Sequence, residues 1–232
     1  IMMSIFVPKT SHLEIINEIG RWKVVPLRAL FEEVGQEVSY QLFCRNVKKL
    51  AMHGLIKSYQ GPHGANYLAL TSEGGKISQY ACPYIESEIE LNHDLLSSMV
   101  LRSLLRFANF QSGHVIHNDE PDLVPDAIIH AIKGQEEYSL AIEVELTQKN
   151  RKRILEKFSK YSKTNQFTHV LYVTNKEGIF DSYRKIISEM NELVSRKVIL
   201  LVEPKLSHTN FEYQTARCWF KGKEAKFDEI FG

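Results

Sequence analysis

Residues 141–150 read AIEVELTQKN, and this stretch decides the expected fold. Its apolar residues alternate, which predicts a strand whose side chains point to opposite faces in turn. Ile142 and Val144 then share one face, and Glu143 and Glu145 share the other. The Cα atoms of the two glutamates would lie about 6.5–7 Å apart. Two carboxylates at that spacing repel each other unless a positive charge lies close to both.

A strongly basic segment follows this strand. Residues 148–163 hold seven Lys or Arg and one Glu, whereas residues 81–126 hold eight Asp or Glu and two Arg. The net charge of +1 therefore conceals two opposed patches. The basic segment has helical spacing of its apolar residues, and we expect its Arg151, Lys152 and Arg153 to contact DNA phosphates.

Composition limits the class of protein. The chain has 232 residues, 44% hydrophobic and 25% charged, which fits one large or two small globular domains. Its three cysteines, Cys44, Cys82 and Cys218, are isolated, which argues against a disulfide scaffold or a structural zinc site and indicates a reducing cytoplasm. No apolar run approaches the ~20 residues that cross a bilayer, so we expect no membrane segment.

Residues 1–82 are predicted to form a winged helix-turn-helix domain. Helices are expected over residues 11–20, 26–35 and 39–54, followed by a hairpin whose tip, residues 61–66, would be the wing. The third helix would be the recognition helix. Its outward side chains suit bases and phosphates: Gln41, Arg45, Lys48 and Lys49. The alternatives are a domain whose basic face is only solvated, or one that contacts proteins.

Residues 83–232 are predicted to form an α/β domain with a mixed sheet, so that the chain as a whole is α+β. A long helix begins near Glu90, and the element order is αβββαβαβ. Strands are expected at 113–118, 126–132, 138–146, 169–174 and 197–203, with helices at 150–163 and 181–196 between them and a last edge strand within 211–220.

A hairpin with a loop of four to six residues would bring Asp126 opposite Glu143 or Glu145, at about 5 Å. Three carboxylates would then converge. A hard divalent cation such as Mg²⁺ relieves their repulsion, and it can activate a water for attack on a phosphodiester. The alternative is that these glutamates are solvated, with Glu145 paired to Lys149 or Arg151.

This pattern resembles the PD-(D/E)xK nucleases, whose core has the order αβββαβ. Pro125 and Asp126 match the first part of the motif and Glu143 the second, but Glu145 occupies the lysine position. The resemblance implies a site for Mg²⁺ or Mn²⁺ on Asp126, Glu143 and Glu145. It also implies a catalytic lysine on the following helix, for which Lys149 and Lys157 are the candidates.

In that fold an acidic residue of the first helix completes the metal site, which points to Asp94, with Glu90 as its rival. The helix macrodipole explains an acidic residue near a helix N-terminus equally well. The choice between these two interpretations stays open.

The combination of a winged helix with "PDA…IEVELT…R…KF..Y" resembles the replication-relaxation family and the MOBC-class plasmid mobilisation relaxases, over about His12 to Glu203. That resemblance implies binding of double-stranded DNA at an origin-like site, a metal-dependent nick without a tyrosine adduct, and other mobilisation proteins as partners. The alternatives are an inactive DNA-binding regulator, a plasmid replication accessory protein, or a protein-interaction module.

Overall fold

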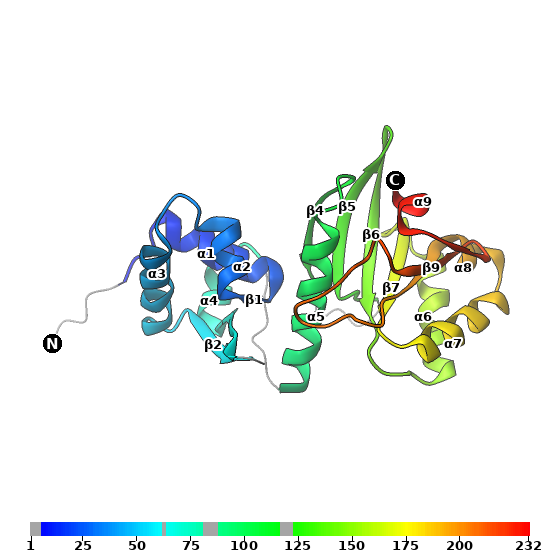
Figure 1. Ribbon diagram of the computed structural model, residues 1–232, viewed down its shortest axis with the longest axis horizontal. Helices are drawn as coiled ribbons and strands as arrows, with labels where there is room; N and C mark the ends of the chain where they lie inside the picture. The colour runs from blue at the N-terminus through cyan, green and yellow to red at the C-terminus, as the bar shows by residue number, and fades with distance from the viewer. Residues whose placement is uncertain (1–5, 62–63, 81–87, 117–122) are drawn as a thin grey trace. The chain divides into compact units, whose positions relative to one another are not determined.

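The computed structural model describes residues 6–61, 64–80, 88–116 and 123–232 (Figure 1). It divides into two compact units, Ile1–Ser98 and Met99–Gly232. The domain boundary predicted from the sequence, after residue 82, lies within residues 81–87, outside the described residues. Within the part of the chain that is described, no helix is long and apolar enough to cross a membrane.

The first unit has the element order of a winged helix. Its three strands form an antiparallel sheet in the order β1-β3-β2. The predicted hairpin is confirmed, with Tyr59 opposite Tyr67, although residues 62 and 63 of its tip lie outside the described residues. The elements are α1 (Thr10–Trp22), β1 (Val24–Pro26), α2 (Leu27–Val34), α3 (Tyr40–Met52), β2 (Ile56–Gln60), β3 (Asn66–Leu70) and α4 (Ser72–Ile77).

The ends of two helices in this unit show when a local residue sets a helix boundary and when it does not. Ser39 caps α3, since its side chain accepts a hydrogen bond from the Leu42 amide at 3.3 Å. In contrast, α1 does not end at Gly20 but continues to Trp22. A Cβ on Gly20 would collide with the Ser78 side chain, so this glycine permits close packing and does not terminate the helix.

The second unit confirms the predicted α+β class with a mixed sheet. The described residues of this unit form a sheet of seven strands in the order β10-β9-β8-β7-β6-β5-β4, with β6, β7 and β8 parallel and the other pairs antiparallel. The order from α5 to β7 is αβββαβ. The elements are α5 (Glu88–Leu104), which begins in the first unit, β4 (Phe110–Val115), β5 (Ala127–Lys133), β6 (Glu136–Val144), α6 (Arg151–Lys163), β7 (His169–Thr174), α7 (Glu177–Ser188), α8 (Glu192–Lys197), β8 (Val198–Val202), β9 (Arg217–Phe220), β10 (Lys223–Ala225) and α9 (Phe227–Phe231).

Three local predictions for this unit were wrong. The helix expected at 181–196 is two helices, because Asn191 caps α8 by accepting a hydrogen bond from the Val194 amide at 3.2 Å. The edge strand is β10, not β9. The turn between β5 and β6 has two residues instead of four to six, since Lys133 pairs with Glu136 and Gly134 supplies the positive φ of 64° that a tight turn requires.

Helices α6, α7 and α8 cover one face of the sheet (Figure 1). Their apolar side chains form one cluster with residues of β6 to β9, including Ala141. Because side chains alternate, Glu143 and Glu145 lie on this same covered face. The opposite face, with Leu140 and Ile142, is also buried. The interpretation of the two glutamates as solvated residues on an open face is therefore wrong.

Candidate functional site

The end of the β5–β6 ladder brings Asp126 to Glu143. Ala127 pairs with Ile142, so extending the register by one residue places Asp126 opposite Glu143. The Asp126 amide donates to the Ile142 carbonyl oxygen at 2.9 Å, and the Asp126 carboxylate Oδ2 accepts from the Val144 amide at 2.7 Å. Two carboxylates from adjacent strands thus meet on the face that α6 covers.

Helix α6 supplies the positive charge that was predicted to lie beside the two glutamates of this strand. Lys157 Nζ donates to Glu143 Oε2 at 2.5 Å, and the Tyr161 hydroxyl donates to Glu143 Oε1. Lys157 and Tyr161 are four residues apart, so they share one face of the helix. Glu143 is only 2% exposed, and both of its oxygen atoms are engaged by α6.

Burial controls the protonation of the Glu143 carboxyl group. It raises the pKa of Glu143 to about 8, against the lowering effect of Lys157 and together with a raising effect of Asp126. Burial, followed by the charge of Glu143, raises the pKa of the Tyr161 hydroxyl far above its usual value. Tyr161 therefore stays protonated as a hydrogen-bond donor and is poorly suited to act as a nucleophile.

Two further tyrosines surround the glutamates. Tyr172 of β7 pairs in register with Glu143, and its buried hydroxyl has no hydrogen-bond partner among the described residues. Burial raises the pKa of Tyr172, with Glu143 and Glu145 as further causes. Burial and then Glu145 raise the pKa of Tyr183 on α7. The sequence analysis did not predict that tyrosines surround the glutamates. The four-residue spacing of Lys157 and Tyr161 was the one sequence feature that could have indicated it, because it places both side chains on the same face of α6.

Glu145 is two residues beyond Glu143 on the same face of the strand, and it has an ion-pair partner of its own. It is 5% exposed, and its Oε2 lies 4.0 Å from Lys149 Nζ, which is the ion pair that the sequence left as an alternative. Throughout the described ranges, no three His, Cys, Asp or Glu side chains are grouped so as to hold a metal ion. The expected convergence of three carboxylates is therefore not formed.

Asp94 belongs to the first unit, where it has an ion-pair partner. Its Oδ2 lies 2.9 Å from Lys23 Nζ, and the Asp94 residue is 7% exposed. Leu95, the next residue of α5, packs with Val24 and Ala69 of the winged-helix sheet. This ion pair gives Asp94 a structural reason for its burial.

Asp126 and Glu143 fit a hard divalent cation in number and kind. Mg²⁺ prefers oxygen ligands and is commonly held by one or two carboxylates, with waters and substrate phosphates completing its shell. The buried Tyr172 hydroxyl beside Glu143 lacks a hydrogen-bond partner among the described residues, as expected for a group that faces a further polar species.

The predicted DNA contacts are exposed on two helices. Gln41, Arg45, Lys48 and Lys49 are all exposed on α3, and Lys49 Nζ lies 5.0 Å from the centre of the Phe6 ring. Arg151, Lys152 and Arg153 are exposed in the first turn of α6, where Arg151 pairs with Glu189. Asn150 caps α6 by accepting a hydrogen bond from the Arg153 amide at 2.9 Å, and the helix dipole together with the three basic side chains favours anions at this end.

Stability should fall as pH rises through the range in which Glu143 titrates. The folded-state pKa of about 8 exceeds the ordinary value of 4.5, so the folded state binds this proton more tightly than the unfolded state does. The resulting stabilisation is complete below pH 4.5 and is lost as pH rises through 8. Melting temperatures measured on both sides of this window should show the decline in wild type and a flatter profile in Glu143→Gln. Parallel profiles for the two proteins would contradict it.

The topology defines a class of protein, a winged helix followed by an αβββαβ domain with a mixed sheet. No protein-family model matches the chain, and no curated protein matches it in sequence. A solved structure of a MarR mutant from E. coli complexed with operator DNA is similar at 15% identity, over 30% of this chain and 50% of that chain, with a TM-score of 0.28.

Two structures of the restriction endonuclease FokI are also similar. One has 10% identity over 83% of this chain and 42% of that chain, with a TM-score of 0.31. The other, FokI bound to DNA, has 11% identity over 85% and 43%, with a TM-score of 0.29. This chain spans half or less of the length of each of these structures. Similarity at this level does not establish a shared activity.

Proposed function

We propose that this protein is a metal-dependent DNA endonuclease that nicks one strand of double-stranded DNA at an origin-like site. The observation that carries the proposal is the meeting of Asp126, Glu143 and Lys157. Two carboxylates lie on adjacent strands of an αβββαβ core, with an ammonium group 2.5 Å from one of them. Metal-dependent phosphodiester hydrolysis requires negatively charged groups that bind a metal cation and a positively charged group that binds phosphate.

Each part of the chain has a role in this proposal. The exposed face of α3 recognises the DNA site, and the basic first turn of α6 contacts the backbone near the cut. Asp126 and Glu143 hold Mg²⁺ or Mn²⁺, which when bound activates a water and stabilises charge on the phosphate. Lys157 contacts the scissile phosphate or orients the attacking water. We prefer it to Lys149 because Lys157 contacts Glu143 directly.

Tyr161 holds the Glu143 side chain in one orientation and does not react itself. Its raised pKa agrees with cleavage that leaves no tyrosine adduct. The more specific assignment, a mobilisation relaxase that acts with other mobilisation proteins, is supported only by the sequence resemblance. Such a protein would act in the cytoplasm, where free thiols such as those of Cys44 and Cys218 stay reduced.

A second candidate is a DNA-binding regulator or replication accessory protein whose nuclease-like domain is inert. One observation favours it: Lys157 already compensates the charge of Glu143, while Glu145 stands in the motif position of the lysine. An ammonium in place of a metal would remove the repulsion without creating an active site.

One experiment separates the two candidates. Duplexes that bind the 232-residue chain are first selected from a randomised pool and then cloned into a supercoiled plasmid. The plasmid is incubated with the protein in Mg²⁺, Mn²⁺ or EDTA, and we expect open-circular product with metal only. Specific binding without nicking in either metal would reject the nuclease and leave the regulator.

The winged helix makes a separate prediction. Replacing Arg45 or Lys48 with alanine in the 232-residue chain should weaken binding to the selected duplex. The slope of log K against log [salt] should fall by about 1 for each phosphate that the protein no longer neutralises. Fluorescence anisotropy at several salt concentrations measures both effects. Lys185→Ala, an exposed change on α7, is the control, and an unchanged slope in the α3 variants would contradict the assignment.

A further inference from the structure

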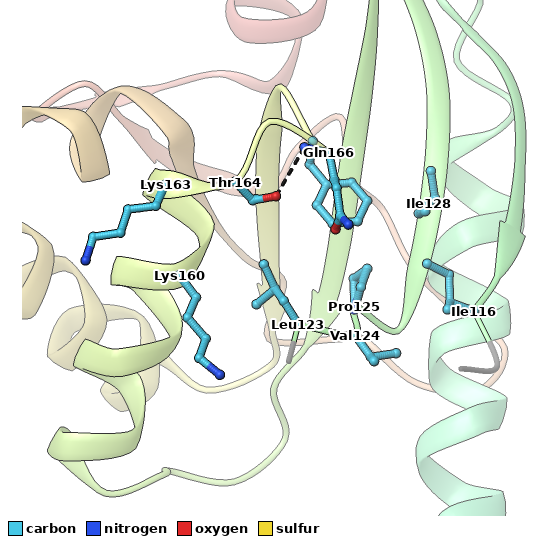
Figure 2. A pocket seen from close by; sticks show the side chains of 10 residues that line it. Ile116, Leu123, Val124, Pro125, Ile128, Lys160, Lys163, Thr164 and Gln166 are labelled. Carbon is cyan, nitrogen blue, oxygen red and sulfur yellow. Dashed lines mark hydrogen bonds between the residues drawn. The ribbon is translucent and has the colours of Figure 1, made fainter. Parts of the chain in front are cut away.

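A pocket of about 750 Å³ lies in the second unit between α6 and the start of β5 (Figure 2). One side is apolar and includes Leu123, Val124 and Ile128. The other side carries Lys160 of α6, with Gln166 on the segment that follows the helix. In Figure 2 the Lys163 side chain, which also contributes to the lining, turns away from the apolar residues.

This pocket adjoins the candidate active site. Pro125 lines it and directly precedes Asp126. Ile128 is two residues beyond Asp126, so its side chain lies on the same face of the sheet as the carboxylate. Lys160 follows Lys157 by three residues and therefore lies on the same side of α6, one turn further along. A strand bound at the carboxylates could thus continue into the pocket.

The lining matches the chemistry of a nucleotide. A base has two apolar faces and a polar edge, and it is linked through its sugar to an anionic phosphate. Leu123, Val124 and Ile128 offer an apolar surface, Gln166 offers an amide that can both donate and accept, and Lys160 offers a cation. The volume lies within the range of about 300–1,000 Å³ that is usual for small-molecule sites.

We propose that this pocket binds one unstacked base of the DNA strand that is cut, with the adjoining phosphate at Lys160. The inference rests on the proposed function, because it names single-stranded DNA next to the cut as the bound form. Bases inside a duplex are stacked and paired, so a pocket on the protein can receive a base only from a single strand or from a nucleotide turned out of the helix.

The test uses the 232-residue chain in EDTA, so that no cleavage can occur. A fluorescent single-stranded oligonucleotide and the duplex of the same selected sequence are titrated by anisotropy, with a deoxynucleoside monophosphate as competitor. Lys160→Met removes the cation, and Val124→Trp fills the pocket from the loop before β5. Lys185→Met on α7 is the matched control, since it removes an exposed lysine outside the pocket.

We expect Lys160→Met and Val124→Trp each to weaken single-strand binding about five- to tenfold, while duplex binding and the control stay within about twofold of wild type. Melting temperatures verify that the variants fold. If Val124→Trp is destabilised, Lys160→Met decides the result, because it alters an exposed helical position.

Two outcomes overturn the inference. In the first, folded Lys160→Met and Val124→Trp proteins bind the single strand as wild type does. In the second, the monophosphate binds but the oligonucleotide does not, which would indicate a site for a free nucleotide. If the wild-type protein does not nick the plasmid, but the pocket variants still weaken single-strand binding, the proposed nuclease is rejected and the pocket is supported. Normal nicking by the pocket variants with unchanged single-strand binding would reject the pocket alone.

Discussion

Glu143→Ala is expected to reduce nicking of the supercoiled plasmid by about 10²–10⁴-fold, the range in which a charged group that acts in the transition state contributes. Glu143 interacts with Asp126, Lys157 and Tyr161. Its removal therefore eliminates the contacts that hold these side chains together at the site. The rate of appearance of open-circular plasmid under single-turnover conditions measures the decrease.

Glu143→Ala should also lower the stability of the protein, and this effect must be separated from the effect on the nicking rate. Tyr161 loses its hydrogen-bond acceptor in a buried position, which costs about 1–3 kcal/mol. Glu143→Gln keeps an acceptor of the same shape and should restore much of the stability without restoring the rate. Glu192→Ala removes an exposed carboxylate on α8 and serves as the control. A folded Glu143→Ala protein that nicks at the wild-type rate would refute the assignment.

Lys157→Met is expected to lower the nicking rate by about 10²-fold or more, since one positioned cation at a developing charge contributes on that scale. Lys149→Met should lower it by less than about tenfold, because Lys149 contacts Glu145 at 4.0 Å and Lys157 contacts Glu143 at 2.5 Å. Comparing the two lysines decides which one replaces the missing motif lysine.

Lys157→Met should also destabilise the protein, because the Glu143 carboxylate loses its cation. Breaking a fully buried ion pair costs about 3–5 kcal/mol. The Lys157 side chain is 25% exposed, so solvent screens the charge and we expect about 1–3 kcal/mol. Urea unfolding at about pH 9, where Glu143 is ionised, measures this destabilisation, with Lys185→Met as the control. A greater reduction of nicking in Lys149→Met than in Lys157→Met would move the catalytic role to Lys149.

Much of the fold follows from local sequence. Ser39 caps α3, the alternation from Leu140 to Glu145 makes a strand, and the run of elements around them gives a winged helix and an αβββαβ core. The misplaced end of α1 shows the limit of such local signals. Gly20 has the identity of a helix terminator, whereas its role is set by packing against Ser78, which is far away in the chain.

Sequence reasoning also placed Glu143 and Glu145 on one face and brought Asp126 to them, because alternation and hairpin pairing are local geometry. It did not determine that α6 covers this face, that Lys157 and Tyr161 engage both oxygen atoms of Glu143, or that Glu145 pairs with Lys149 and not with Arg151.

Those features belong to the tertiary structure. The backbone period decides which side of a strand a residue occupies, but packing between distant elements decides which helix lies over that side. The partners of a buried charge are therefore set by that packing. The stretch AIEVELTQKN by itself required a positive charge beside its glutamates, and only the crossing of α6 over β6 determined that Lys157 provides it.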